Sequence, residues 1–359
     1  MTVTTIAQFD TTLVTVGVDT HLDVHVAVAL DQLGRRLGDL EIPTTQDGYD
    51  DLADWAESFG EVEAFGIEGT GCYGAGLARV LRARGLLVVE VLRPKRQTRR
   101  HKGKSDLIDA EAAARAVLSG EAAGAPKTGD DIAEIIRVLR IQRQTAVKAR
   151  TQAINSMRAL LVTAPIELRD QLRGLPKNKL IAAAARLRPG NDRDVLVGVK
   201  RSLRALARRC QHLDAEVAEL DADLDELVRS AAPALVALFG FGTDTAGQLI
   251  VTAGDNPDRL RSDAAFSMLC GSSPQPAGSG KTNGRHRLNR GGDRQANAAL
   301  YRVALVRMRW HQPTRDYVER RTKEGKSKPE IIRCLKRYIA RQAYTALTST
   351  QPAEAQAAA

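Results

Sequence analysis

One unbroken heptad pattern limits the architecture of this chain more than any other feature. Such a pattern, with apolar residues at alternating steps of four and three, is the a/d seam of a coiled coil. A weaker apolar stripe runs through 132–160, so two helices could pair within one chain or with another subunit. We therefore predict an α-helical coiled-coil middle region, 126–230. The seam residues are Val199, Leu203, Leu206, Cys210, Leu213, Val217, Leu220, Leu224 and Leu227.

The segment before this region has the pattern of an α/β domain. Short β-branched or apolar runs alternate with helical stretches, and the first two runs resemble a hairpin. Strands and helices at such short spacing favour a mixed sheet covered by helices, which we place at residues 10–125. The expected strands are 13–18, 23–30, 37–42, 63–67 and 86–91, and the expected helices are 47–59, 74–84 and one from about 106.

Four acidic residues mark this domain. Asp19 and Glu68 each close a run that reads as a buried strand, where a carboxylate is costly unless a positive group meets it. Asp106 and Asp109 lie three residues apart at the front of an Ala-rich helix, so they share one helix face. Carboxylates converging from two strand ends and a helix can hold two Mg²⁺ ions, with Mn²⁺ as a substitute, for phosphodiester cleavage. Surface acids and helix capping by Ser105 or Asp106 are the simpler interpretation of each residue alone.

Charge indicates a polyanionic partner. The 53 Lys and Arg residues against 43 Asp and Glu give a formal net charge of +10, which favours nucleic acid. No apolar run approaches the roughly 20 residues of a membrane-spanning helix, and the start is polar and Thr-rich, so we expect a cytoplasmic protein. A basic strip precedes Asp106 and is either a solvated loop or a phosphate-binding segment. It contains Arg93, Lys95, Arg96, Arg99, Arg100, Lys102 and Lys104.

The last part of the chain reads as a separate, mostly α-helical domain, 231–345, followed by a tail, 346–359, without expected structure. Its LFGFGTDTAGQL segment resembles a helix-hairpin-helix turn, although a glycine C-cap explains Gly240 and Gly242 equally well. Ser279 lies between two glycines and is either an ordinary loop serine or a nucleophile activated by surrounding cations. Ser272 and Ser273 lie close by as alternative nucleophiles. The cations that follow Ser279 are Lys281, Arg285, Arg287, Arg290 and Arg294.

Together these motifs resemble the IS110 family of insertion-sequence transposases. GVDTH, GIEGTG and KSDLIDA, which carry the four acids in order, resemble the family's RuvC-like DEDD domain. PAGSGKTNGRHRLNRGGDRQANAAL resembles its C-terminal transposase domain, in which the catalytic serine corresponds to Ser279. The resemblance covers most of the chain, and the helical middle fits it as well.

The resemblance implies an RNase H-like N-terminal domain whose Mg²⁺ site cleaves DNA strands together with the serine of another subunit. It further implies a covalent phosphoserine link, donor and target DNA as substrates, and a homo-oligomer, a dimer or a tetramer on DNA. A structured noncoding guide (bridge) RNA would choose the sequences by base pairing. This RNA follows from the resemblance alone.

Three other functions compete with a recombinase. A RuvC-like Holliday-junction nuclease explains the carboxylates and the basic surface but leaves the C-terminal domain without a role. An actin-like or sugar-kinase-like ATPase would share an RNase H-like sheet, yet paired phosphate loops are missing from the sequence; GSGKT has neither the spacing nor the preceding strand of a P-loop. A non-catalytic scaffold for nucleic acid is the third.

Overall fold

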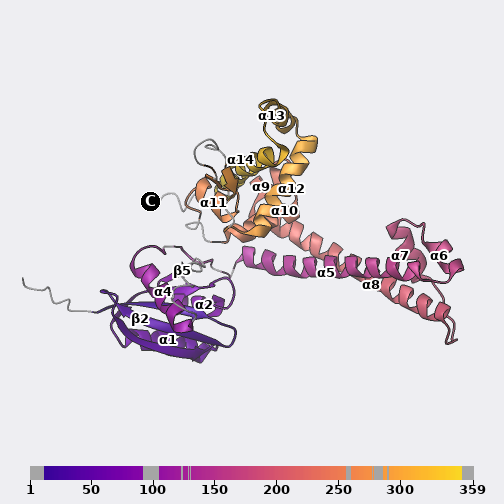
Figure 1. The fold of residues 1–359 in the computed structure, drawn as a ribbon. Coiled ribbons are helices and arrows are strands. Elements are labelled where there is room, and N and C mark those ends of the chain that lie inside the picture. Colours follow the sequence, from indigo (N-terminus) through magenta and orange to yellow (C-terminus); the bar gives the residue numbers. More distant parts are fainter. Residues whose placement is uncertain are drawn as a thin grey trace, which may run out of the picture. The chain divides into compact units, whose positions relative to one another are not determined.

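The chain forms two compact units. The computed structural model describes residues 12–91, 105–122, 124–127, 129, 131–255, 260–276, 278, 286–288 and 291–349. One unit comprises Met1–Asp131 with Ala253–Arg261, and the other comprises Ile132–Thr252 with Ser262–Ala359. Figure 1 shows that the first is a helix-covered sheet and that the second is built mainly of helices. Within the described segments, no helix is long and apolar enough to cross a membrane.

The first unit contains a five-stranded mixed sheet. Its order is β3-β2-β1-β4-β5, with β2 antiparallel to β1 and β3, and β4 parallel to β1 and β5. Each strand expected from the sequence is present, and the hairpin of the first two is confirmed. This mixed sheet fits an RNase H-like domain. The strands are β1 (Leu13–Thr20), β2 (Val24–Asp31), β3 (Arg36–Pro43), β4 (Glu61–Glu68) and β5 (Val88–Val91).

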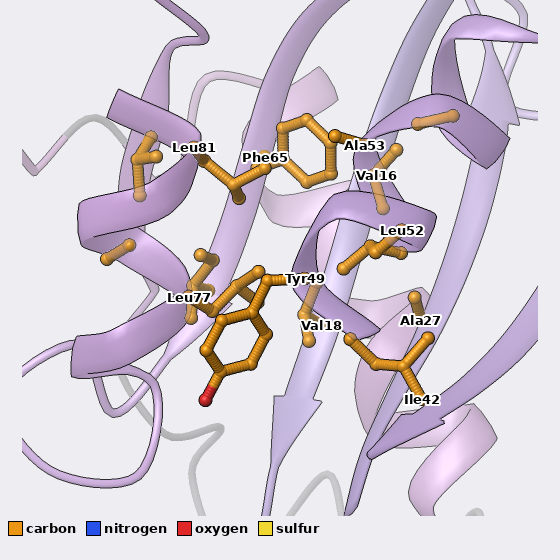
Figure 2. Close-up of a cluster of buried hydrophobic side chains, with 14 of the residues drawn as sticks. Val16, Val18, Ala27, Ile42, Tyr49, Leu52, Ala53, Phe65, Leu77 and Leu81 are labelled. Atoms are coloured by element: carbon orange, nitrogen blue, oxygen red, sulfur yellow. The ribbon is translucent and has the colours of Figure 1, made fainter. Parts of the chain in front are cut away.

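One face of the sheet is covered by helices α1 (Gln46–Glu57) and α2 (Ala75–Ala83). Side chains of a strand alternate between faces, so β1 sends Val16 and Val18 into this layer, where they meet Leu52 of α1. Figure 2 shows these residues in one apolar cluster with side chains of β4 and α2. The largest core of the unit therefore lies between β1 and the first two helices.

The opposite face carries helix α4 (Asp106–Leu118), which lies directly on the strand backbones. Gly17 of β1 and Gly66 of β4 are paired neighbours in the sheet. A Cβ atom on Gly17 would lie only 2.0 Å from the carbonyl oxygen of Ala110 and 2.3 Å from the amide nitrogen of Ala114. The two glycines thus form a flat patch on which a helix of small residues can rest.

The second unit begins with a long antiparallel pair, α5 (Ile132–Val162) and α8 (Val195–Ala231). Ion pairs join Arg143 to Asp221 and Arg150 to Asp214, so the residue numbers run in opposite directions along the two helices. Pairing within one chain is the arrangement found, whereas supercoiling and pairing between subunits stay predictions. Of the heptad seam, Val199, Leu206 and Leu227 are partly exposed, and the buried members are Leu203, Cys210, Leu213, Val217, Leu220 and Leu224.

Further helices and a two-stranded sheet complete the described part of the unit. The turn between α9 and α10 contains Gly240 at φ 84°, as a glycine-capped helix end requires, and its expected phosphate-binding role stays a prediction. Helix α14 continues three residues into the segment expected to be a tail, because Ala346 extends its buried stripe. The elements are α6 (Ile166–Leu172), α7 (Lys177–Ala185), α9 (Pro233–Ala237), α10 (Thr243–Ala253), α11 (Asp263–Leu269), β6 (Pro274–Pro276), β7 (His286–Leu288), α12 (Arg294–Trp310), α13 (Gln312–Lys323) and α14 (Lys328–Thr348).

The contact between α4 and the sheet leads to a first prediction. Gly17→Ala places a methyl group against helix backbone, which lacks a flexible end that could move aside, and should cost roughly 1–3 kcal/mol or more. Thermal or urea denaturation would measure the loss. Gly71→Ala is the matched control, because its added methyl group would meet no atom within 4 Å. Equal stability of the two variants would contradict the close approach.

Candidate active site

Two of the four predicted acids lie on neighbouring strands and point to the same face. Gly17 and Asp19 are two residues apart on β1, and so are Gly66 and Glu68 on β4. Because side chains alternate, each acid shares the α4 side of the sheet with its glycine. The pairing of Val18 with Ile67 brings the two carboxylates to adjacent strand ends, where they are 8% and 7% exposed.

The other two acids come from the first turn of α4. Asp106 is the first residue of the helix and half-exposed, whereas Asp109 faces inward and is 9% exposed. The close approach of α4 at Gly17 carries this turn toward the strand ends. Acidic groups are also favoured at a helix N-terminus, where unpaired N–H groups and the helix dipole offset their charge.

The structure brings two of the four acids into direct proximity, together with a histidine. Nε2 of His21 lies 3.3 Å from Oδ2 of Asp19 and 3.5 Å from Oδ1 of Asp106. One ligand atom from each of these three residues lies within 4.8 Å of the others. Among the described residues this is the group of acidic and imidazole side chains close enough to share a metal ion.

Glu68 and Asp109 belong to the same electrostatic site. Burial raises the pKa of Asp19, and the negative charges of Glu68, Asp109 and Asp106 raise it further, whereas His21 acts in the opposite direction. Like charges held together in a partly dry site disfavour ionisation of one another. The arrangement therefore suits a cation, whose charge would stabilise all four carboxylates at once.

His21 lies four residues before His25, a spacing that brings side chains together on a helix but is misleading on the strand or hairpin expected here. The structure separates the two residues. His25 is fully buried and stacks on Tyr49 with 5.8 Å between ring centroids, and burial lowers its pKa. His21 follows the end of β1 and faces the acids. The usable signal was its two-residue offset from Asp19, which is the period of one strand face.

A hydroxyl group ties the two strand ends together behind the acids. Oγ1 of Thr20 donates a buried hydrogen bond of 2.7 Å to the backbone carbonyl of Glu68. This bond links the residue after Asp19 to the backbone that carries the second acid. It therefore limits independent movement of the two carboxylates.

The predicted basic strip and the predicted serine lie outside the residues that the structure describes. Arg287 is described on β7 and Arg294 at the start of α12, and both side chains are exposed. Ser272 is fully buried and its hydroxyl lies 2.8 Å from that of Ser267, so it is held in the interior. The residues outside the described segments are Arg93, Lys95, Arg96, Arg99, Arg100, Lys102, Lys104, Ser279, Lys281, Arg285 and Arg290.

A mixed five-stranded sheet with four acids at two strand ends and on a covering helix defines the class of RNase H-like DEDD domains. Comparison with known families agrees. Residues 16–165 match the transposase DEDD model of IS110 elements, and residues 232–319 match a model described as "Transposase IS116/IS110/IS902 family". The chain belongs to the IS110 family of transposases. Its family therefore supports DNA transposase or recombinase activity and the use of a divalent metal.

A curated relative is also named for an insertion element. The chain is 26% identical over 278 residues to the "Insertion element IS900 uncharacterized 42 kDa protein" of Mycobacterium paratuberculosis. The match covers 66% of this chain and 70% of the relative. Membership of a transposase family accounts for the C-terminal region, which matches a transposase model at residues 232–319. A junction nuclease or an ATPase would leave this region without a role.

The raised pKa of Asp19 gives a second prediction, about the metal-free protein. The pKa of the Asp19 carboxyl group is higher in the folded protein than in the unfolded chain. The folded state is therefore most stable below the pKa of the unfolded chain, and it loses stability as the pH rises through the pKa of the folded protein. Asp19→Asn should therefore raise the melting temperature in EDTA, by more at about pH 8 than at about pH 4, close to the ordinary pKa of an aspartate.

With added Mg²⁺, the parent should have the higher melting temperature and the Asp19→Asn variant the lower one. The ion should stabilise the parent by mass action and the Asp19→Asn variant much less. Asp51→Asn, at an exposed position of α1, is the control and should respond to Mg²⁺ as the parent does. A variant that is less stable than the parent in EDTA at both pH values would contradict this account.

Proposed function

We propose that Asp19, Glu68, Asp106 and Asp109 hold Mg²⁺, with Mn²⁺ as a substitute, in a site that cleaves donor and target DNA. The observation that carries this proposal is the convergence of Asp19 and Asp106 around His21, within 4.8 Å. Carboxylate oxygens are the ligands that Mg²⁺ prefers, and their buried negative charge fits a divalent cation. A bound metal pair would stabilise the attacking and leaving oxygens of a phosphodiester.

Two strands and one helix position the four carboxylates. Asp19 and Glu68 are held by paired strands, and Thr20 fixes the backbone between them. Asp106 and Asp109 are carried by α4, so their positions depend on how closely that helix rests on the sheet. His21 is near enough to two of the carboxylates to orient them or to serve as a further ligand.

We further propose that Ser279 is the nucleophile. Its hydroxyl would lose a proton, Oγ would form a bond to the DNA phosphorus, and a deoxyribose oxygen would leave and gain a proton. A phosphoserine link conserves the phosphodiester bond energy, so the strand can be rejoined to a new partner without ATP. The family resemblance of the surrounding motif supports this role. Burial of Ser272 adds support, because it removes one neighbouring alternative.

The remaining parts of the proposal concern partners. A net charge of +10 supports nucleic-acid binding, and the resemblance supports a structured guide RNA that pairs with donor and target DNA. A homo-oligomer, a dimer or a tetramer on DNA, would allow several strands to be cut and exchanged together. Sequencing the RNA that copurifies with the protein tests the guide directly.

The metal site leads to the third prediction. Asp109→Asn keeps the size of a buried side chain while removing one ligand charge, so DNA cleavage in Mg²⁺ should fall by about a hundredfold or more. The measurement uses labelled DNA with the copurified RNA present. Glu63→Gln, an exposed position on the same strand as Glu68, is the matched control. Full cleavage by Asp109→Asn would remove this residue from the site.

The serine leads to the fourth prediction. End-labelled DNA incubated with the protein and RNA should give a protein–DNA adduct that survives a denaturing gel. Ser279→Ala should abolish the adduct, because alanine has no oxygen to bond to phosphorus. Ser273→Ala should leave it intact. An adduct that persists in Ser279→Ala and disappears in Ser273→Ala would move the nucleophile to the second serine.

A further inference from the structure

A basic pocket lies between helices α12 and α14 of the second unit, with a volume of about 860 Å³. One wall is an α12 face made by Arg294, Asn297 and Tyr301, whose spacing of three and four is that of one helix side. The other wall is the N-terminal half of α14. The residues of α14 that line the pocket are Lys328, Pro329, Ile332, Arg333 and Lys336. Gly271, Arg287 and Gly292 complete the lining.

One side of this pocket is fixed by contacts to the backbone after α11. The side-chain amide of Asn297 donates hydrogen bonds from Nδ2 to the carbonyls of Cys270, at 3.2 Å, and Gly271, at 2.7 Å. Gly292 and Gly271 approach so closely that a Cβ atom on Gly292 would lie 2.1 Å from the amide nitrogen of Gly271. The loop after α11 is thereby held against the start of α12, and the pocket is formed in advance of any ligand.

The charge inside the pocket is positive and unbalanced. Lys336 is only 6% exposed, and its ammonium donates a 2.8 Å hydrogen bond to Oδ1 of Asn297, a neutral acceptor. In the part of the chain that the structure describes, no carboxylate lies within ion-pair distance of this group. Burial lowers the pKa of Lys336, and the nearby charge of Arg333 lowers it further. A buried cation without an anion is costly, so this position favours an anionic ligand.

The nearest acidic residue on α14 is already engaged. Glu330 accepts hydrogen bonds from the amide and the hydroxyl of Ser327, at 2.9 and 2.6 Å, in a capping box. The pocket lining contains no acidic residue. The first turn of α14 also places the positive end of a 21-residue helix beside the pocket, which adds to the attraction for an anion.

The same pocket has an apolar side. Tyr301 is 43% exposed although it lines the pocket, and Ile332 and Pro329 lie on the opposite helix. An exposed aromatic ring beside cations is the arrangement on which unpaired bases stack. The pocket is also of the size that usually accommodates ligands as large as a nucleotide. A bare phosphate would leave the apolar part unused.

We propose that this pocket binds one unpaired nucleotide of a nucleic-acid strand, with its phosphate at Lys336 and Arg333 and its base against Tyr301. The inference deepens the proposed function and rests on it for the class of ligand. It adds a recognition site for a single-stranded or flipped nucleotide, in residues outside the metal site. DNA and RNA both offer a phosphate and a base that can stack, so titrations with each kind of strand must decide which one the pocket binds.

The test measures binding of fluorescent oligonucleotides to the full-length protein by anisotropy in EDTA, so that metal-dependent cleavage does not contribute. Lys336→Met should weaken binding of a short single strand about tenfold, because it removes a charge-assisted phosphate contact. It should leave the melting temperature unchanged or raised, since a buried charge is replaced by an apolar chain. A lysine that merely supports the fold would give the opposite result, a lower melting temperature with unchanged affinity.

Tyr301 tests the base. Tyr301→Ala should weaken binding of the single strand about tenfold, and Tyr301→Phe should restore it, because stacking needs the ring and not the hydroxyl. With a strand built of abasic sites, which has phosphates and no bases, Tyr301→Ala should bind as the parent does. Arg208→Gln, an exposed position on α8, is the charge control and should change affinity by less than about twofold.

The outcomes separate this inference from the proposed function. Parental affinity in both Lys336→Met and Tyr301→Ala would overturn the pocket while leaving the metal site intact. Loss of binding in both variants, combined with DNA cleavage that does not respond to Asp109→Asn, would support the pocket and overturn the proposed chemistry. Parallel titrations with single-stranded DNA, single-stranded RNA and blunt duplex identify the strand, and equal loss on duplex would overturn recognition of an unpaired nucleotide.

Discussion

The close approach of α4 to the sheet is the contact on which the candidate active site depends. A helix that bears large side chains would stand well away from the strands, and its first turn would not reach their ends. Here Gly17 lies beneath Ala110 and Ala114, and its neighbour Gly66 lies beneath Ala113 and Val117, so the helix backbone rests almost directly on the strand backbone. Two acids of the site come from the strands and two from the helix. Small residues at this contact therefore determine whether the acids meet, although none of these residues carries any chemistry.

That packing creates a site which is unfavourable for the folded protein on its own. Asp19 is nearly buried beside three other carboxylates, and its raised pKa records the cost of ionising it there. Hydrophobic layers on the other face, around Val16, Val18 and Leu52, supply the compensating stability. Natural proteins often hold functional groups in such strained surroundings at some cost to stability. In this protein that cost comes first from the burial of Asp19 and then from repulsion by the neighbouring negative charges, and a bound cation would offset both.

Much of the first unit could be predicted from the sequence because its signals are local. Strand periodicity, the acids that end β1 and β4, and the spacing of Asp106 and Asp109 are all readable within short windows. The position of His21 was harder to see, since it depends on α4 bringing Asp106 to the end of β1. The basic pocket could not be predicted at all. Asn297 and Lys336 lie 39 residues apart, and their hydrogen bond exists only once α12 and α14 are packed together. The partner of the heptad seam could not be predicted either, because the pattern fits a helix of the same chain and a helix of another subunit equally well.

The two candidate sites hold charges of opposite sign for a related reason. In the first unit, acidic side chains gather around His21, and in the second, the buried ammonium of Lys336 has a neutral partner, Asn297, with no carboxylate within ion-pair distance among the described residues. A metal ion and a nucleic-acid phosphate are the complementary groups, and each would relieve a cost that the fold otherwise bears. Salt affects the two interactions differently, because counterions compete for phosphate contacts along a strand far more than for a buried carboxylate site. The formal charge of +10 therefore averages over a cluster of acidic side chains in the first unit and a pocket lined by basic side chains in the second.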